Sequence, residues 1–445
     1  MELFVRTKNM KIISFLGFNN YQETTYVHPS DSGKQSTTPF FQEALIDFFD
    51  QDILYIFLTK TVETKLPRGA TQSNWEALQD RLKNSKVKLE AVYNVPEGNS
   101  PEDSWLIFDK ITECLNHGDK VVLDLTHSFR SIPVIALLAI SYLRTVRQVT
   151  VEGLVYGAFN PNVQGQPTQT YDLLPMLGLL DWIAATDRFV KVGDGVPLAE
   201  LLKNAIPGTE RQHNPAVRPL GSQLDLASKI IGEISQAIAL VRPLETLELT
   251  VRLEEILNRA DDGFDQRAKP FTLIAGQLLE EYGQFALSDS LDSESLSRNL
   301  WLQFQMIDWY MKRGQVMQAM TLAGEWLISV VAYRLGSNHL LDSRKQVGFA
   351  LNNGSAILQK KQPQKSSEFD QAFQALPDYE ELSDLRGILS EIRNDLAHVG
   401  MNKNPKSAKK LVDLANQIFP RLQSLAENLL ISDDSPSVGE LPQTI

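Results

Sequence analysis

The sequence predicts an α/β domain with a mostly parallel sheet, followed by a region that is entirely helical. In residues 10–192, short apolar runs alternate with amphipathic helical segments, the pattern of a sheet covered on both faces. From Leu198 onward, apolar residues recur at three- and four-residue spacing with few strand signals. A chain of 445 residues has room for two or three such domains.

The predicted strands of the first domain are short apolar runs bounded by turn residues. The first is Lys11–Gly17, which closes on a glycine. Further strands are predicted at Asp52–Thr59, Val87–Tyr93, Val121–Leu125 and Val149–Tyr156, with a hairpin at Glu23–Val27. The helices between them are predicted at Pro39–Phe49, Trp75–Leu82, Pro101–Leu115 and Ile132–Thr145.

The helical region divides into a connector and a terminal bundle. In the connector, helices are predicted at Leu224–Leu240, Leu244–Asn258 and Phe271–Leu287. In the bundle they are predicted at Leu300–Lys312, Gln315–Leu335, Leu382–Val399 and Ala408–Ile431, with polar loops over residues 336–379.

Composition and charge narrow the class of protein. The net charge of -12 argues against a wide surface that coats nucleic acid, although it leaves room for a small basic pocket. Cys114 is the only cysteine, so no intrachain disulfide can form, and a reducing cytoplasm is expected. The six histidines are scattered without metal-ligand spacing, so no metal and no cofactor are expected. Neither a signal peptide nor a membrane span is predicted.

The turn after the fourth main strand carries a cluster of polar side chains. It reads Asp124-Leu-Thr-His-Ser-Phe-Arg-Ser-Ile-Pro133, and the proline suits the first turn of the next helix. In parallel sheets, ligands bind beyond the carboxyl ends of the strands, where helix N-termini attract anions. Thr126, His127, Ser128, Arg130 and Ser131 therefore form a candidate phosphate or ribose site. The alternative is simple helix capping by a serine beside an exposed histidine.

Residues 10–192 resemble a CARF domain, the Rossmann-like sensor of accessory ribonucleases in type III CRISPR systems. The resemblance depends on Leu16-Gly17, on the Asp124-Leu-Thr-His127 turn, and on Val155-Tyr-Gly-Ala158. It implies a homodimer that binds one cyclic oligoadenylate across its two-fold axis. The implied ligand-binding residues are Thr126, His127, Ser128 and Arg130, with Gly17, Phe18 and Asn19 as further candidates. A glycine often follows the histidine in relatives, whereas Ser128 stands here, which leaves the ring size open.

A second motif lies near the end of the last but one predicted helix, at Arg393-Asn-Asp-Leu-Ala-His398. The helical pattern puts Arg386, Arg393, Asn394 and His398 outside an apolar stripe made by Leu385, Ile388, Leu389, Ile392, Leu396 and Val399. Arg393 and His398 are about 140° apart around the helix, so a second copy packed on this face would bring two of each together. The alternative is a solvated helix face that happens to carry a histidine.

This second motif, in a helical bundle, resembles a HEPN ribonuclease domain, whose signature is an arginine, four to six residues, and a histidine. The resemblance implies metal-independent cleavage of single-stranded RNA at a composite dimer site made by Arg393, Asn394 and His398, leaving 2′,3′-cyclic phosphate ends. Glu325-Trp326 in an earlier helix also fits the family. The pair CARF–HEPN implies activation by a cyclic oligoadenylate, expected to be cyclic tetra-adenylate. A homodimer or a larger assembly of dimers is implied, and DNA is not an expected partner.

The predicted organisation has five parts: an N-terminal extension (1–9), the sensor (10–192), a helical connector (193–288), the ribonuclease bundle (289–431) and a disordered tail (432–445). Two other functions remain open at this point. The chain could be a nucleotide-sensing regulatory module whose helical part only dimerises, or a sensor that itself degrades the ring nucleotide.

Overall fold

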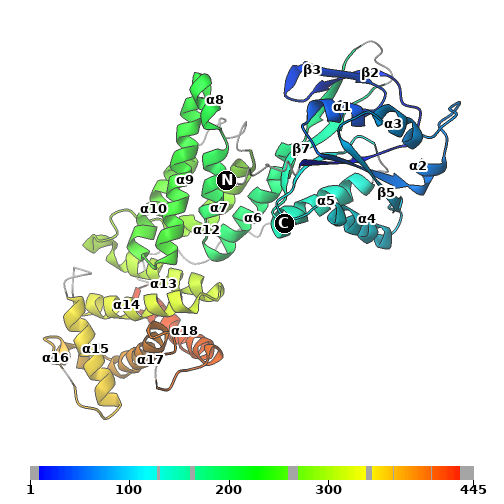
Figure 1. The fold of residues 1–445 in the computed structure, drawn as a ribbon. Helices are drawn as coiled ribbons and strands as arrows, with labels where there is room; N and C mark the ends of the chain where they lie inside the picture. The colour runs from blue at the N-terminus through cyan, green and yellow to red at the C-terminus, as the bar shows by residue number, and fades with distance from the viewer. Residues whose placement is uncertain are drawn as a thin grey trace, which may run out of the picture. The chain divides into compact units, whose positions relative to one another are not determined.

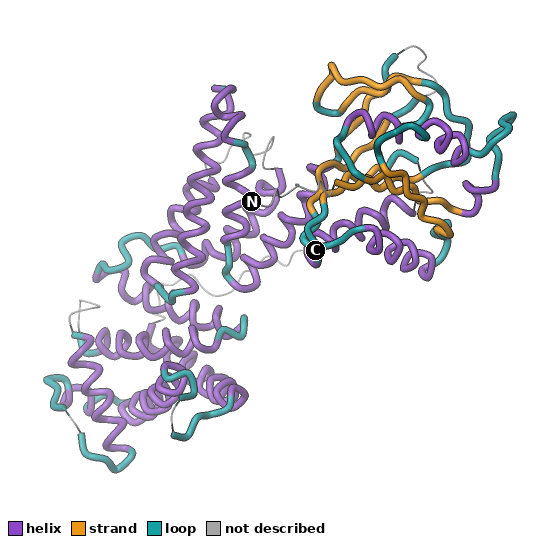
Figure 2. The backbone as a smooth tube through the Cα atoms, in the orientation of Figure 1, coloured by secondary structure: helices purple, strands orange, loops and turns teal. Residues whose placement is uncertain are grey.

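The structure, a computed structural model, describes residues 10–127, 131–160, 166–258, 269–336, 343–363, 365–401 and 403–430. The predicted extension, the predicted tail, Ser128 and Arg130 lie outside these residues. The chain forms two compact units, Met1–Leu180 and Asp181–Ile445. Strands gather in the first unit, whereas the described elements of the second are helices (Figure 1, Figure 2).

The first unit is built on an eight-stranded sheet with the order β3-β2-β8-β7-β6-β1-β4-β5. The neighbouring pairs β7–β6, β6–β1, β1–β4 and β4–β5 are parallel, and so is the pair β2–β8. The pairs β7–β8 and β2–β3 are antiparallel. The predicted mostly parallel sheet is therefore confirmed. The strands are β1 Met10–Phe15, β2 Thr24–His28, β3 Asp31–Thr38, β4 Ile53–Thr59, β5 Lys88–Val95, β6 Lys120–Asp124, β7 Thr150–Gly157 and β8 Thr168–Asp172.

Helices cover both faces of this sheet because successive strand residues point to opposite sides. On β1, Ile12 packs in one apolar cluster with residues of α1 and α3, while Ile13 packs in the other with residues of α4 and α5. Both isoleucines are fully buried. The helices are α1 Phe41–Phe48, α2 Lys60–Thr64, α3 Asn74–Leu82, α4 Pro101–Cys114 and α5 Ser131–Val146.

Strand β8 and the length of the β2–β3 hairpin are not predicted from the sequence. β8 has the sequence TQTYD, which lacks an apolar run, but Thr168 and Thr170 are buried on one face. The strand forms because β7 supplies its antiparallel partner and β2 its parallel partner. Pairing across the sheet thus overrides a weak local pattern.

The second unit is helical and has one continuous apolar core, which extends from Ala185 to Ala426. The helix α6 Leu174–Val192 runs from the first unit into it. The remaining helices are α7 Val196–Asn204, α8 Gly208–His213, α9 Arg218–Ala239, α10 Pro243–Asn258, α12 Lys269–Tyr282, α13 Leu296–Lys312, α14 Val316–Arg334, α15 Arg344–Leu358, α16 Asp370–Gln374, α17 Tyr379–Ala397 and α18 Ala408–Leu430, with short 3-10 turns at Pro215–Val217, Gly283–Phe285 and Ser293–Ser295.

The prediction of polar loops over residues 336–379 is wrong, because this stretch contains α15 and α16. α15 has the sequence RKQVGFALNNGSAIL, in which polar residues and two glycines obscure the helical pattern. Val347, Ala350 and Leu351 nevertheless lie at helical spacing and are buried in the core. Tertiary packing therefore stabilises a helix of low intrinsic propensity.

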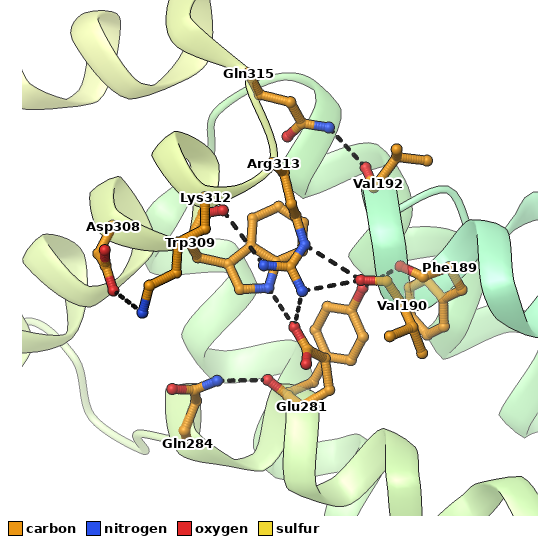
Figure 3. A network of polar contacts seen from close by, with 11 residues as sticks. Phe189, Val190, Val192, Glu281, Gln284, Asp308, Trp309, Lys312, Arg313 and Gln315 are labelled. Atoms are coloured by element: carbon orange, nitrogen blue, oxygen red, sulfur yellow. Dashed lines mark hydrogen bonds and ion pairs between the residues drawn. The ribbon is translucent and has the colours of Figure 1, made fainter. Parts of the chain in front are cut away.

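The C-terminal end of α6 is capped by side chains of the helices packed around it. The Arg313 guanidinium donates to the carbonyl of Val190 (2.9 Å), forms an ion pair with Glu281 and stacks on the ring of Trp309 (Figure 3). Gln315 donates to the carbonyl of Val192 at 2.8 Å. The last carbonyls of a helix have no partner within it, so these contacts anchor the end of α6 in the second unit.

One described helix, α14, is long and apolar enough to cross a membrane by length and composition. Of its most apolar window, 67% is buried inside the second unit. Its contacts with α13, α15, α17 and α18 are those of a central core helix.

Candidate functional site

The Arg393–His398 motif lies at the C-terminal end of α17. The helix buries Leu382, Leu385, Leu389 and Ile392 in the core, which leaves Arg393, Asn394 and His398 exposed. The predicted stripe ends at Leu396, because the helix stops at Ala397. Val399 lies beyond it, is 73% exposed and adopts a left-handed φ of 48°, which a β-branched residue rarely does.

The position of His398 is set by the way α17 ends. His398 is the C-cap residue, and its backbone N–H donates to the carbonyl of Asn394 at 3.1 Å. The N–H of Val399 donates to Leu396 (3.1 Å) and that of Gly400 to Asp395 (3.2 Å), a pair of bonds typical of a Schellman motif. The imidazole is therefore attached to a backbone that is fixed by hydrogen bonds although it is exposed.

Asp395, between the two motif residues, is a buried side chain. It is 4% exposed, and its carboxylate accepts the backbone N–H of Lys406 at 3.0 Å. The Lys406 ammonium in turn pairs with Glu391 of the same helix at 2.5 Å. Asp395 thus ties the segment that follows His398 back to α17. The helical pattern alone does not distinguish this residue from a surface charge.

Arg393 is paired with Glu325 of α14. Its Nη1 lies 2.9 Å from Glu325 Oε1, and its side chain is 47% exposed. The other carboxylate oxygen of Glu325 lies 2.6 Å from Nη2 of Arg344, on α15. One carboxylate therefore joins two guanidinium groups from different helices.

Arg386 does not lie on the exposed side of α17, contrary to the helical projection. It is 9% exposed, and its guanidinium donates to Asn352 Oδ1 (2.8 Å) and to the carbonyl of Gly324 (3.4 Å). Burial lowers the pKa of this guanidinium, whereas the nearby Glu325 carboxylate raises it. The projection fails because α15, which was not predicted, covers that flank of α17.

In the first unit, the turns after β1 and β6 lie side by side because these two strands are parallel neighbours. The ring of His127 stacks on that of Tyr21 with centroids 4.5 Å apart. The Tyr21 hydroxyl accepts the backbone N–H of Gly17 at 2.7 Å. The structure therefore brings together Gly17 and His127, two of the predicted ligand-binding residues. Tyr21, which links them, was missed because it lies in a polar stretch without a recognisable motif.

The residues at the end of β6 and at the start of the turn after it also connect neighbouring strands. Asp124 is fully buried and accepts hydrogen bonds from the Ser14 hydroxyl (2.6 Å) and the Thr126 N–H (2.8 Å). The Thr126 hydroxyl accepts the N–H of Gly157 at 2.9 Å, which connects the turn to the end of β7. Thr126 thus bridges two strand ends, in addition to its predicted role towards ligand.

Burial shifts the pKa of two side chains in this turn, Asp124 and His127. It raises the pKa of the Asp124 carboxyl to about 6, although hydrogen bonds from Ser14 and Thr126 oppose the shift. It lowers the pKa of His127 to about 4, so the imidazole is neutral at neutral pH. A neutral His127 can donate one hydrogen bond and stack against a base, but it does not supply positive charge to a phosphate.

The loop after β1 contains the other predicted ligand residues. Asn74, at the start of α3, donates from its side chain to the carbonyls of Gly17 and Asn19, both at 2.8 Å. The Lys65 ammonium lies 4.0 Å from the centre of the Phe18 ring. Asn74 therefore fixes the loop, and Lys65 is a cation beside it that the motif does not include. Ser128 and Arg130 lie outside the described residues.

A family model and two known proteins are similar to this chain over different shares of its length. Residues 11–161 match the family model described as the CARF domain of the CRISPR system endoribonuclease Csx1. CRISPR-associated protein MJ1674 of Methanocaldococcus jannaschii is 28% identical over 123 residues, which are 27% of this chain and 19% of that protein. The structure of Enterococcus italicus Csm6 bound to cyclic hexa-2′-fluoro-hexa-dAMP is similar with a TM-score of 0.39 and 11% identity, over 96% of each chain.

The match of residues 11–161 to the CARF model confirms the predicted resemblance of the N-terminal region. The chain spans about a fifth of the length of the curated relative that it matches, since the shared segment is 19% of that protein. The helical bundle with Arg393 and His398 lies beyond the residues that the CARF model matches.

Proposed function

We propose that this chain is an RNA endonuclease of cytoplasmic CRISPR defence that is activated by a cyclic oligoadenylate, because residues 11–161 match the model of the CARF domain of the endoribonuclease Csx1. Its helical bundle is a HEPN domain that cleaves single-stranded RNA without a metal ion. The observation that carries the proposal is the exposure of Arg393, Asn394 and His398 together at the end of α17, on the same chain as the sensor.

The chemistry of these side chains is sufficient for RNA transesterification. The reaction needs a base for the ribose 2′-hydroxyl, an acid for the departing 5′-oxygen, and positive charge on the phosphate in the transition state. Histidine suits proton transfer near neutral pH, and the permanently charged Arg393 suits a phosphate. The products are a 2′,3′-cyclic phosphate and a 5′-hydroxyl.

One chain supplies a single histidine at this motif, so the complete site is proposed to contain Arg393 and His398 from each of two chains. The surface of α5 supports pairing of the sensor. Val134, Leu138, Tyr142 and Val146 follow each other at four-residue spacing and are 47–60% exposed. The opposite side of α5 is buried, so this helix carries apolar residues on both sides, which is typical of a helix that is covered on both sides.

The activator is proposed to bind at the turns after β1 and β6, near Gly17 and His127, with cyclic tetra-adenylate as the expected ring. Binding would favour the arrangement of the dimer in which the two α17 motifs meet. Such activation requires only that the ring bind this arrangement more tightly than the idle one.

The test is cleavage of a fluorescent single-stranded RNA in EDTA, with cyclic tetra-adenylate, cyclic hexa-adenylate or no activator. We expect cleavage only with a ring nucleotide, and products that carry 2′,3′-cyclic phosphate. His398→Ala should abolish cleavage and leave ring binding unchanged, because His398 lies in the second unit and is exposed. A parent chain that binds a ring but never cleaves RNA would instead indicate a regulatory module.

A further inference from the structure

Glu325 is the centre of a cluster of three arginines from two helices. Its carboxylate contacts Arg344 at 2.6 Å and Arg393 at 2.9 Å. Arg386 lies close enough for the charges of Glu325 and Arg393 to affect its pKa. Three guanidinium groups around one carboxylate leave an excess of positive charge at this point of an acidic protein, which suits the backbone of an RNA strand.

The two arginines that contact Glu325 are held very differently. Arg344 also donates to the Ser329 hydroxyl and to the backbone carbonyl of Glu325 (3.1 Å), and its side chain is 21% exposed. Arg393 is 47% exposed and contacts the Glu325 carboxylate from the open side. Arg344 thus fixes the carboxylate, and the carboxylate orients Arg393.

A cavity of about 400 Å³ adjoins this cluster. Glu325, Ser329 and Arg344 line it, together with Thr321 and Gln303 and the segment 241–245 before and at the start of α10. Glu325 therefore lines a cavity that is large enough for a small ligand, and it also contacts Arg393 of the exposed motif. Arg344 contacts Glu325, and Glu325 in turn contacts Arg393 near the exposed end of α17.

We infer that Glu325 is a positioning residue for Arg393, and that Arg344 holds Glu325 in place. This inference rests on the proposed ribonuclease function. A free arginine side chain samples many rotamers, whereas phosphate stabilisation in a transition state requires a fixed planar fork. The contact with Glu325 involves Nη1 of Arg393, so the other N–H groups of the guanidinium can still bind a phosphate. The same contact restricts the orientation of the whole guanidinium plane. The opposite role, a carboxylate that competes with RNA for Arg393, predicts the opposite sign in the experiment below.

The test is Glu325→Gln in the full-length chain, with initial rates measured against RNA concentration at saturating activator. We expect kcat to fall about tenfold with KM changed less, because the loss falls mainly on the transition state. Arg344→Met should lower kcat in the same direction. The double variant should be no slower than Glu325→Gln alone, since both changes act through one carboxylate.

The matched control is Glu381→Gln. Glu381 forms an ion pair with Arg421 at 2.7 Å and is 46% exposed, close to the 42% of Glu325, but it lies at the opposite end of α17 from Arg393. This control should cleave at the parental rate, and all variants should unfold near the parental temperature. Parental or faster cleavage by Glu325→Gln, or an equal loss in Glu381→Gln, would overturn the inference. A parent chain without any cleavage would instead refute the proposed function.

Discussion

At the scale of single residues, burial separates the roles of neighbouring polar groups. Arg393 and Asp395 are two positions apart on α17, yet one is half exposed and the other is 4% exposed. The first side chain reaches the solvent, and the second holds the segment after His398 by accepting the N–H of Lys406. In the sensor, Asp124 is buried beside the partly buried His127 in the same way. Sequence identifies such groups as polar, whereas their surroundings decide what they do.

The raised pKa of Asp124 predicts a pH-dependent stability. In the folded state its pKa is about 6, above the ordinary 3.8, so the folded chain binds the proton more tightly than the unfolded chain. Below pH 4 the carboxyl is protonated in both states, so the raised pKa does not change the free energy of unfolding. Above pH 6 the carboxylate is charged in both states, and its burial lowers the free energy of unfolding by about 3 kcal/mol. Asp124→Asn removes this charge, and the Ser14 hydroxyl can accept as well as donate.

The measurement is denaturant unfolding of the parent and of Asp124→Asn between pH 4 and pH 8. We expect the variant to gain stability relative to the parent as the pH rises, by up to about 3 kcal/mol. The contribution of His127, whose lowered pKa acts in the opposite sense, cancels in this difference. A gap that stays constant with pH would show that Asp124 is not the titrating group.

At the scale of elements, α5 shows how one helix can serve two surfaces. Ile132, Ala136, Ala139 and Ile140 pack against the sheet, while the stripe Val134, Leu138, Tyr142 and Val146 faces outward. An apolar stripe of this kind is uncommon on a surface that stays exposed. It therefore marks the face through which the sensor is proposed to dimerise.

Leu138→Lys tests this face. Leu138 is 60% exposed, so the substitution should leave the fold of the monomer intact but place a charge in the proposed interface. We expect light scattering after gel filtration to show a monomer, and RNA cleavage to be lost with it. Leu226→Lys, at a leucine of α9 that is 44% exposed, is the control and should remain dimeric and active. A dimeric, active Leu138→Lys chain would move the interface elsewhere.

At the scale of the whole molecule, the proposed active site does not belong to one chain. Two copies of α17 would bring two arginines and two histidines together, so a mixed dimer of Arg393→Ala and His398→Ala chains keeps one of each. We expect both homodimers to be inactive and the purified mixed dimer to recover part of the parental rate. Differently tagged chains allow its isolation. An inactive mixed dimer would show either that both histidines are needed or that Arg393 and His398 must come from the same chain, and in both cases one residue of each kind would be insufficient.

Much of the molecule follows from local sequence patterns. The apolar runs of β1, β4 and β6 specify buried parallel strands, because such runs satisfy both faces of a covered sheet. The Asp124–His127 turn and the Arg393–His398 spacing are visible without coordinates, because each motif is contiguous in the chain.

The tertiary structure alone determines the contacts between groups that are distant in sequence. α15 forms because α14 and α17 cover its small apolar face, and that packing buries Arg386. Tyr21 reaches His127 across 106 positions, and Glu325 meets Arg344 and Arg393 from a third helix. Local patterns encode periodicity and turn chemistry, whereas the partner of a buried or paired charge depends on how the whole chain packs.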